Sequence, residues 1–164
     1  NPFAVASSRM KIGWRGFLNA FCNQKELYDS YLYPYMSIIS KCETELEKII
    51  CMWCIQNIVP IIQLKHDSNT YICYYEQFYL EPQHEIKKLM QWLNTDIQYN
   101  DHELRKLSRM TKTNYTTDHN FVTAWRNSFS DKEIDRGINI LSCFGMTDIY
   151  DSDFYPKQNS INAK

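Results

Sequence analysis

The most regular pattern of apolar positions in the chain lies between Thr44 and Ile61. Apolar residues recur there at intervals of three and four, which is the spacing of one face of an α-helix. They are Leu46, Ile49, Ile50, Trp53, Cys54 and Ile61. The pattern predicts one long amphipathic helix. Pro60 is expected to kink or perturb its end, because proline cannot donate the backbone hydrogen bond of that turn.

Two further helices carry signals at their ends. Asn1 precedes Pro2, which predicts a helix entered through Asn1 with proline at its first position, where the missing N–H costs nothing. Late in the chain, Ser130 and Glu133 form the S-x-x-E pattern of a capping box. The apolar positions that follow predict a helix that stops near Gly145.

The middle of the chain predicts two helices and a strand. The segment EPQHEIKKLMQWLN, with Pro82 near its start, predicts a helix, and a second short helix is expected from Asp101 to Leu107. The run TYICYY at residues 70–75 is short, β-branched and aromatic, and it is the best strand candidate. It lacks apolar–polar alternation, which favours a strand covered on both faces, as in a parallel sheet.

A single strand cannot form a sheet, because its backbone groups need a neighbouring strand. No other segment of the sequence reads as one, and the chain has no initiator methionine. We therefore expect the partner strands to lie outside this chain, which would make it a fragment. The expected fold class is α/β, mostly helical within this chain, with one clear buried parallel strand.

Composition narrows the possible functions. The 164 residues have the length of about one domain, and 44% of them are hydrophobic, which is enough to bury a core. The formal net charge is −1, which argues against a nucleic-acid-binding protein held by bulk positive charge. No apolar stretch reaches the roughly 18 residues that a membrane span needs, so no membrane anchor is visible.

The chain has six cysteines, and Cys51 and Cys54 form a C-x-x-C pattern. This pattern lies in a strongly helical run, with no second C-x-x-C and no histidine nearby. Packed core thiols are the favoured interpretation, because an unpaired cysteine behaves as a small buried hydrophobe. A metal or redox site built on these two thiols is the alternative.

Four blocks of the sequence carry a resemblance. In chain order they read NPFAVASSRMKIGW, MWCIQN, YYEQFYLEPQHEIKKLMQWLN and AWRNSFSDKEIDRGINILSCFGMTDIY. Together they resemble the C-terminal half of a sulfotransferase that uses 3′-phosphoadenosine-5′-phosphosulfate (PAPS). The resemblance implies a P-loop-type sulfotransferase fold. Residues 1–156 would be the C-terminal part of a single sulfotransferase domain, and residues 157–164 a polar tail. The phosphosulfate loop would lie upstream of residue 1.

The resemblance implies two nucleotide contacts. Ser8 falls where the family has a serine that binds the 3′-phosphate, and a helix start would favour that phosphate. Tyr75 falls where the family places an aromatic ring against the adenine. Gln77 and Tyr74 depart from the family pattern, which has an aspartate and often an arginine at these positions. The alternatives are a solvated polar helix face for the Ser-Ser-Arg triplet and a buried strand aromatic for Tyr75.

A late basic loop, SRMTKTNYTT, lies where many sulfotransferases close over the nucleotide. Its cations and hydroxyls suit a phosphate, although a solvated loop is the alternative. The candidate residues are Ser108, Arg109, Thr111 and Lys112. In the same comparison, Glu76 is expected to be a structural hydrogen-bonding carboxylate and Trp125 a packing anchor.

The catalytic residues stay unknown at this point. The family's base is a histidine or glutamate in the half that would lie upstream of residue 1. The histidines of this chain are scattered on turns and polar helix faces, and none is expected to be catalytic. They are His66, His84, His102 and His119.

The expectation is therefore a fragment of a sulfotransferase. The intact enzyme would transfer a sulfuryl group from its co-substrate PAPS to a hydroxyl or amine of a small-molecule or carbohydrate acceptor, with no metal and no nucleic-acid partner. This chain would supply the 3′-phosphate and adenine side of the nucleotide site and would be inactive alone. The alternative is a non-catalytic helical protein-interaction domain. The compartment, cytoplasm or Golgi lumen, and the oligomeric state stay open.

Overall fold

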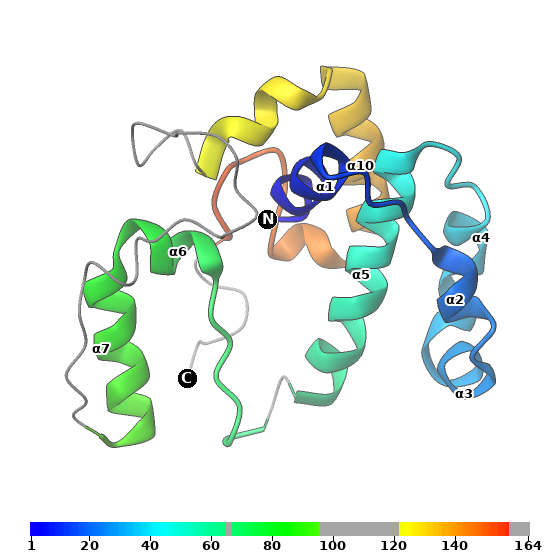
Figure 1. Cartoon of the computed structure of the whole chain (residues 1–164). Helices are drawn as coiled ribbons and strands as arrows, with labels where there is room; N and C mark the ends of the chain where they lie inside the picture. Colours follow the sequence, from blue (N-terminus) through cyan, green and yellow to red (C-terminus); the bar gives the residue numbers. More distant parts are fainter. Residues whose placement is uncertain (65–66, 96–121, 158–164) are drawn as a thin grey trace.

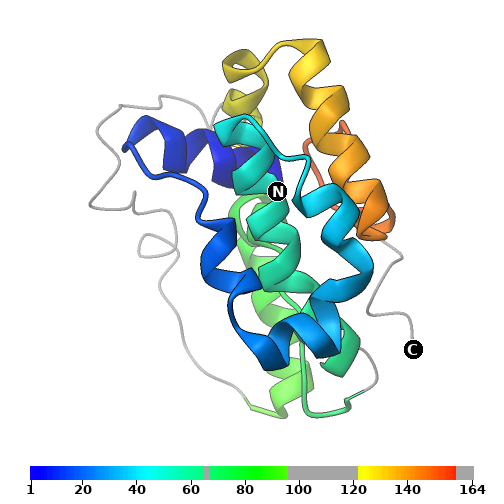
Figure 2. The same ribbon diagram turned by 90° about the vertical axis from the view of Figure 1, so that its right-hand side faces the viewer.

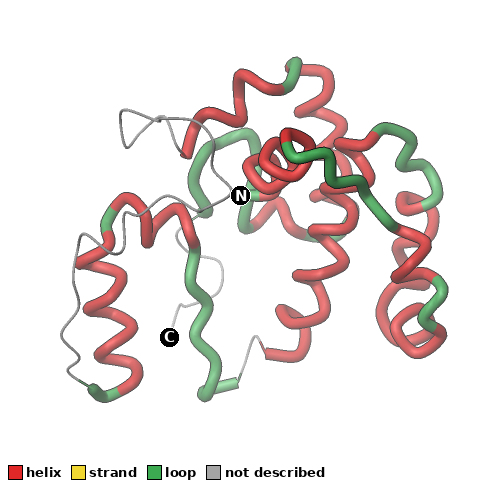
Figure 3. The backbone as a smooth tube through the Cα atoms, viewed as in Figure 1, coloured by secondary structure: helices red, strands yellow, loops and turns green. Residues whose placement is uncertain are grey.

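The computed structural model describes residues 1–64, 67–95 and 122–157. Within these ranges the backbone forms helices, turns and loops and no β-strand, as the tube in Figure 3 shows. The longest helix, α5 (Glu45–Leu64), stands in the middle of the molecule (Figure 1). It continues past Pro60, so this proline lies inside the last turns of the helix instead of ending it.

The hydrophobic core is built around α5. Its buried residues are Leu46, Ile49, Ile50, Cys51, Met52, Cys54, Ile55 and Ile58. Two helices from opposite ends of the chain, α1 (Pro2–Lys11) and α10 (Asp131–Cys143), both pack against it (Figures 1 and 2). The apolar face predicted for this segment is therefore the face that carries the core.

Short helical turns connect α1 to α5. In chain order they are α2 (Leu18–Cys22), α3 (Lys25–Leu27), the π-helical turn η1 (Tyr28–Leu32), the 3₁₀ turn η2 (Tyr33–Tyr35) and α4 (Met36–Ile39). Pro34 lies in the 3₁₀ turn, where its missing N–H interrupts regular α-helical bonding. Leu18, Leu32 and Ile39 are buried, so these turns cover one side of the core.

The signals predicted at the ends of α1 and α10 are confirmed. Oδ1 of Asn1 accepts hydrogen bonds from the backbone nitrogens of Phe3 at 2.9 Å and Ala4 at 3.3 Å. Pro2 is the first residue of α1. Gly145 follows the end of α10 with a φ of +68°, a conformation that glycine adopts without strain.

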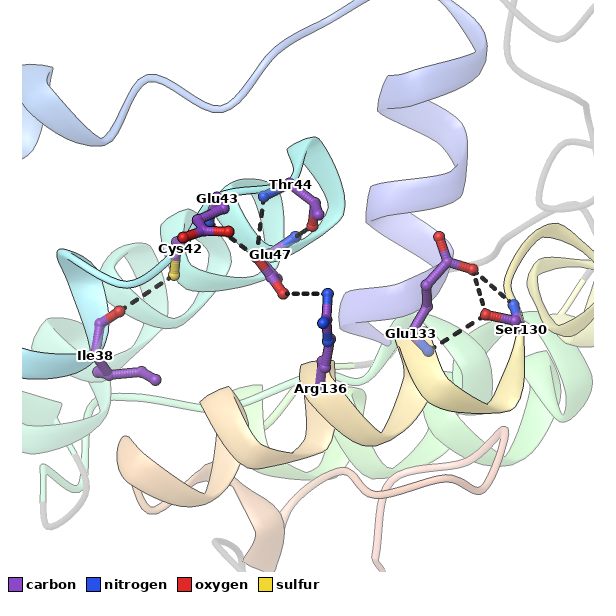
Figure 4. Close-up of polar contacts among 8 residues, drawn as sticks. All are labelled: Ile38, Cys42, Glu43, Thr44, Glu47, Ser130, Glu133 and Arg136. Carbon is purple, nitrogen blue, oxygen red and sulfur yellow. Dashed lines mark hydrogen bonds and ion pairs between the residues drawn. The ribbon is translucent and has the colours of Figure 1, made fainter.

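Two capping boxes stabilise the starts of α10 and α5 (Figure 4). At α10, the backbone nitrogen of Ser130 donates to Oε2 of Glu133 at 2.8 Å, and Glu133 donates back to Oγ of Ser130 at 3.4 Å. At α5, Thr44 donates to Oε2 of Glu47 at 2.9 Å, and Glu47 donates back at 3.2 Å. Arg136 of α10 also donates to Glu47, at 3.4 Å, and so joins the two helices. Only the first box was predicted.

The predicted strand at residues 70–75 is wrong. Residues 71–74 have no regular structure, and Tyr75 instead begins a helix, α6 (Tyr75–Leu80). A β-ladder needs a second extended backbone beside the first, and the part of the chain that the structure describes places none there. The α/β expectation is thereby corrected: the described residues form a helical assembly with no buried parallel strand.

Aromatic contacts, and not the hydrogen bonds of a β-ladder, hold the segment around residues 71–74 in place. The ring of Tyr71 lies 5.6 Å from that of Trp92 in α7 (Pro82–Leu93), the helix predicted after Pro82. The ring of Tyr74 lies 6.2 Å from that of Tyr150 in an edge-on arrangement. The segment therefore connects α7 to the C-terminal part of the chain.

Two 3₁₀ turns, η3 (Ala124–Ser128) and η4 (Met146–Asp148), flank α10. Trp125 in η3 is buried and is a packing anchor, as expected. Lys157, the first residue of the predicted polar tail, donates to the carbonyl of Thr147 at 2.7 Å and so belongs to the folded body. Residues 158–164 and the helix predicted at 101–107 lie outside the described residues. Among the helices that are described, none combines the length and apolarity needed to cross a membrane.

Candidate functional site

Glu76, in the first turn of α6, is a buried carboxylate with 3% exposure. The hydroxyl of Tyr150 donates to its Oε2 at 2.9 Å, and the backbone nitrogen of Asn1, the amino group of the first residue of the given sequence, pairs with its Oε1. Burial and the adjacent charge of Glu76 raise the pKa of Tyr150, so this phenol stays a hydrogen-bond donor at neutral pH. The expectation that Glu76 is a structural hydrogen-bonding carboxylate agrees with these contacts.

Three segments meet at Asn1. Its backbone nitrogen reaches Glu76 of α6, while its side-chain nitrogen donates to the carbonyls of Asp153 at 3.2 Å and Phe154 at 3.4 Å. The start of α1, the start of α6 and the C-terminal segment are therefore bonded at one point, close to the N mark in Figure 1. Long-range polar contacts of this kind fix how the three segments lie relative to one another.

Tyr75 lies beside this junction but faces outward, with 61% of its surface exposed. It lines a hollow of about 350 Å³ together with Cys73, Phe78 and Tyr79, called here the aromatic hollow. The rings of Tyr75 and Tyr79, one helical turn apart, lie 6.2 Å from each other with planes 27° apart. The alternative of a buried strand aromatic is therefore wrong for Tyr75, whose ring lies on an open apolar surface.

The Ser-Ser-Arg triplet of α1 does not form one solvated face. Ser7 is buried and shares a hydrogen bond of 2.9 Å with Ser128 of η3, whereas Ser8 is exposed. Ser8 is the seventh of ten residues in α1. It lies about 10 Å along the helix axis from Asn1. The expected help from a helix start does not apply to Ser8, because the favourable end of the dipole is confined to the first turn.

Arg9 follows Ser8 and contacts the ring of Trp14. Its guanidinium carbon lies 5.9 Å from the ring centre of Trp14, within the range of a cation–π interaction. One guanidinium nitrogen, Nη1, is buried and has no hydrogen-bond partner among the described residues. Arg9 is therefore a partly buried cation beside the exposed hydroxyl of Ser8.

Most of the other predicted site residues and histidines lie outside the described residues. Ser108, Arg109, Thr111 and Lys112 lie outside the described residues, as do His66, His102 and His119. His84 is exposed on α7. It belongs to no group of metal-binding side chains within the described ranges. The elements that carry Ser8 and Tyr75 are joined through the bond between Asn1 and Glu76.

The C-x-x-C pair belongs to the core. Cys51 and Cys54 are both fully buried on α5, as packed thiols are expected to be. Burial raises the pKa of the Cys54 thiol, which keeps it protonated and unreactive at neutral pH. Residues 1–64, 67–95 and 122–157 hold no group of three histidine, cysteine or acidic side chains arranged to bind a metal.

Sequence reasoning missed Tyr79 and Tyr150. Tyr79 follows Tyr75 by four residues, a spacing that places both rings on one face of a helix, but the sequence predicts that Tyr75 ends a strand. No local signal pairs Tyr150 with Glu76, since 74 residues separate them. The rings of Tyr75 and Tyr79 offer an apolar platform for a planar ring, and the exposed hydroxyl of Ser8 can donate to an anion.

Comparisons with protein-family models, with curated proteins and with solved structures find no match for the chain.

Proposed function

We propose that this chain is part of a PAPS-dependent sulfotransferase and supplies the 3′-phosphate and adenine side of its nucleotide site. One observation supports the proposal most: a contact between Asn1 and Glu76 joins α1 and α6, the two helices that carry the candidate residues Ser8 and Tyr75. Each of these helices leaves its candidate side chain exposed, Ser8 on α1 and Tyr75 on α6.

In the proposed site, the Ser8 hydroxyl donates to an oxygen of the 3′-phosphate. The Tyr75 ring lies under the adenine, since an exposed aromatic face suits a flat heterocycle. Arg109, Thr111 and Lys112 supply further charge and hydroxyl groups toward the phosphates. The sulfuryl group passes to a hydroxyl or amine of a small-molecule or carbohydrate acceptor as its bond to the 5′-phosphate breaks. The acceptor's proton goes to a base that the resemblance puts upstream of residue 1, and adenosine 3′,5′-bisphosphate leaves.

The experiment is a calorimetric titration of the full natural protein that contains this chain with adenosine 3′,5′-bisphosphate and with AMP. Ser8→Ala should weaken binding of the bisphosphate roughly tenfold or more, because a hydrogen bond to a charged group is lost. Binding of AMP, which lacks the 3′-phosphate, should hardly change. The matched control is Ser142→Ala, which removes an exposed serine from the second half of α10. Equal losses for both nucleotides would show that Ser8 does not contact the 3′-phosphate.

A non-catalytic helical protein-interaction domain is the second candidate. The end of α1 and the segment after it favour this candidate, because large apolar side chains are exposed there. They are Met10, Ile12, Trp14 and Phe17, with exposures between 40% and 66%. The same titration separates the two functions, since an interaction domain has no reason to bind adenosine 3′,5′-bisphosphate.

A further inference from the structure

Glu76 and Tyr75 are neighbours in the chain with opposite environments. Consecutive residues of a helix point about 100° apart. Tyr75 is 61% exposed in the aromatic hollow, whereas Glu76 is 3% exposed. A buried carboxylate is costly unless donors satisfy both of its oxygens. Glu76 has such a donor on each oxygen, from the backbone nitrogen of Asn1 and from the hydroxyl of Tyr150.

We propose that Glu76 is a positioning residue of the nucleotide site, which holds Ser8 on α1 in a fixed place relative to Tyr75 on α6. The inference rests on the proposed function. Glu76 touches no nucleotide in this arrangement. It acts through Asn1, which begins the helix that carries Ser8, and through its own helix, which carries Tyr75.

A second buried carboxylate shows what is special about Glu76. Glu85 on α7 is 4% exposed, nearly as buried as Glu76. Its Oε1 accepts from Lys88, one turn further along the same helix, at 2.7 Å. Glu85 therefore pairs within its own helix, whereas both donors to Glu76 lie more than 70 residues away in the sequence. Glu76 sets the relation between segments, and Glu85 provides a matched control.

The test compares Glu76→Gln with Glu85→Gln in the full natural protein. Glutamine keeps the size of glutamate but offers one acceptor oxygen in place of two, so one of the two long-range hydrogen bonds is lost or reversed. Glu76→Gln should weaken binding of adenosine 3′,5′-bisphosphate about tenfold or more. Glu85→Gln should change it less than about twofold, as expected for a residue outside the site. Circular dichroism confirms that each variant is folded.

A double-mutant cycle distinguishes positioning from general stabilisation. If Glu76 places Ser8, the combined variant Ser8→Ala with Glu76→Gln should lose less affinity than the product of the two single losses. A purely structural role would lower the melting temperature and leave the affinity of the folded protein unchanged. Tyr150→Phe removes only one donor, and we expect a smaller loss of affinity, about threefold.

The outcomes separate this inference from the proposed function. If the unsubstituted protein binds no adenosine 3′,5′-bisphosphate, the proposed function and this inference both fail. If the unsubstituted protein binds it and folded Glu76→Gln binds equally well, or if the cycle is additive, only the role of Glu76 fails. Should Glu76→Gln not fold, Tyr150→Phe decides the question in the same way, and unchanged affinity in that variant overturns the inference.

Discussion

Phe3 and Trp125 stack face to face, with ring centres 4.9 Å apart and planes 17° apart. They lie far apart in the sequence, and both are almost completely buried. The stack joins α1 to η3, and the hydrogen bond between Ser7 and Ser128 joins the same two elements. The position of α1, and with it that of Ser8, therefore depends on the C-terminal third of the chain.

Removing the Trp125 ring should destabilise the protein strongly. Trp125→Ala should cost about 3–5 kcal/mol of unfolding free energy, the range for large aromatic residues in a core. Trp125→Phe should cost much less, because the part of the chain that the structure describes offers the buried indole nitrogen no hydrogen-bond partner, and phenylalanine removes that donor. Urea unfolding gives both values. Trp92→Ala, at a 40% exposed site, is the control, and a similar cost there would argue against the Phe3–Trp125 contact as an anchor.

Gly137 of α10 packs closely against Phe3 and Ile50 of the core. A methyl group added there would lie 2.6 Å from the Phe3 ring and 2.7 Å from Cδ1 of Ile50. Gly137→Ala should lower stability by about 1–3 kcal/mol, the usual cost of overpacking, even though alanine is the better helix former. Ser142→Ala on the exposed face of α10 should change stability by less than about 0.5 kcal/mol. Thermal unfolding of both variants checks this, and a stabilised Gly137→Ala would contradict the packing.

The carboxylates of the two capping boxes should make the free energy of unfolding decrease at acid pH. Partial burial acts to raise the pKa of Glu47, but hydrogen bonds from the backbone amides of Thr44 and Glu43 outweigh it, so this pKa lies below its usual value. Hydrogen bonds with Ser130 lower the pKa of Glu133. A carboxyl group with a lowered pKa in the folded state stabilises the protein above its unfolded pKa, near 4.5. That contribution is lost as the pH falls through the folded pKa.

Melting temperatures between pH 6 and pH 3 test this prediction. The protein should lose stability below about pH 4.5. The double variant Glu47→Gln and Glu133→Gln should lose less over the same interval, because glutamine can still cap a helix but does not titrate. Glu26→Gln, at an exposed glutamate, should follow the unsubstituted protein. Identical pH profiles for all three proteins would mean that the capping carboxylates do not contribute.

Tyr75 should act through its ring more than through its hydroxyl. Tyr75→Phe should leave the affinity for adenosine 3′,5′-bisphosphate within about threefold, since the aromatic face remains. Tyr75→Ala should weaken it by about tenfold, because stacking on a base contributes about 1–3 kcal/mol. Calorimetric titration of the folded variants gives both values. Unchanged binding in Tyr75→Ala would remove Tyr75 from the proposed site.

The sequence alone determined features that depend on neighbouring residues. Asn1 and Pro2 start α1, Ser130 and Glu133 start α10, and Gly145 stops it, because caps and stops are made by side chains within a few positions of the helix end. The apolar spacing from Leu46 onward likewise located the helix around which the core forms. The capping box of Thr44 and Glu47 could have been predicted in the same way, since it has the same S/T-x-x-E pattern.

Only the tertiary structure decided what residues 70–75 become. The run TYICYY has strand propensity, but propensity is weak without a neighbouring backbone to bond. Aromatic packing of Tyr71 and Tyr74 orders the segment, and Tyr75 enters a helix. The contact between Glu76 and Tyr150 was equally out of reach, because nothing local connects residues 74 positions apart. Glu76 is paired because it is buried, since an unpaired carboxylate in the interior would cost too much free energy. The residues next to it in the sequence do not indicate which donors it pairs with.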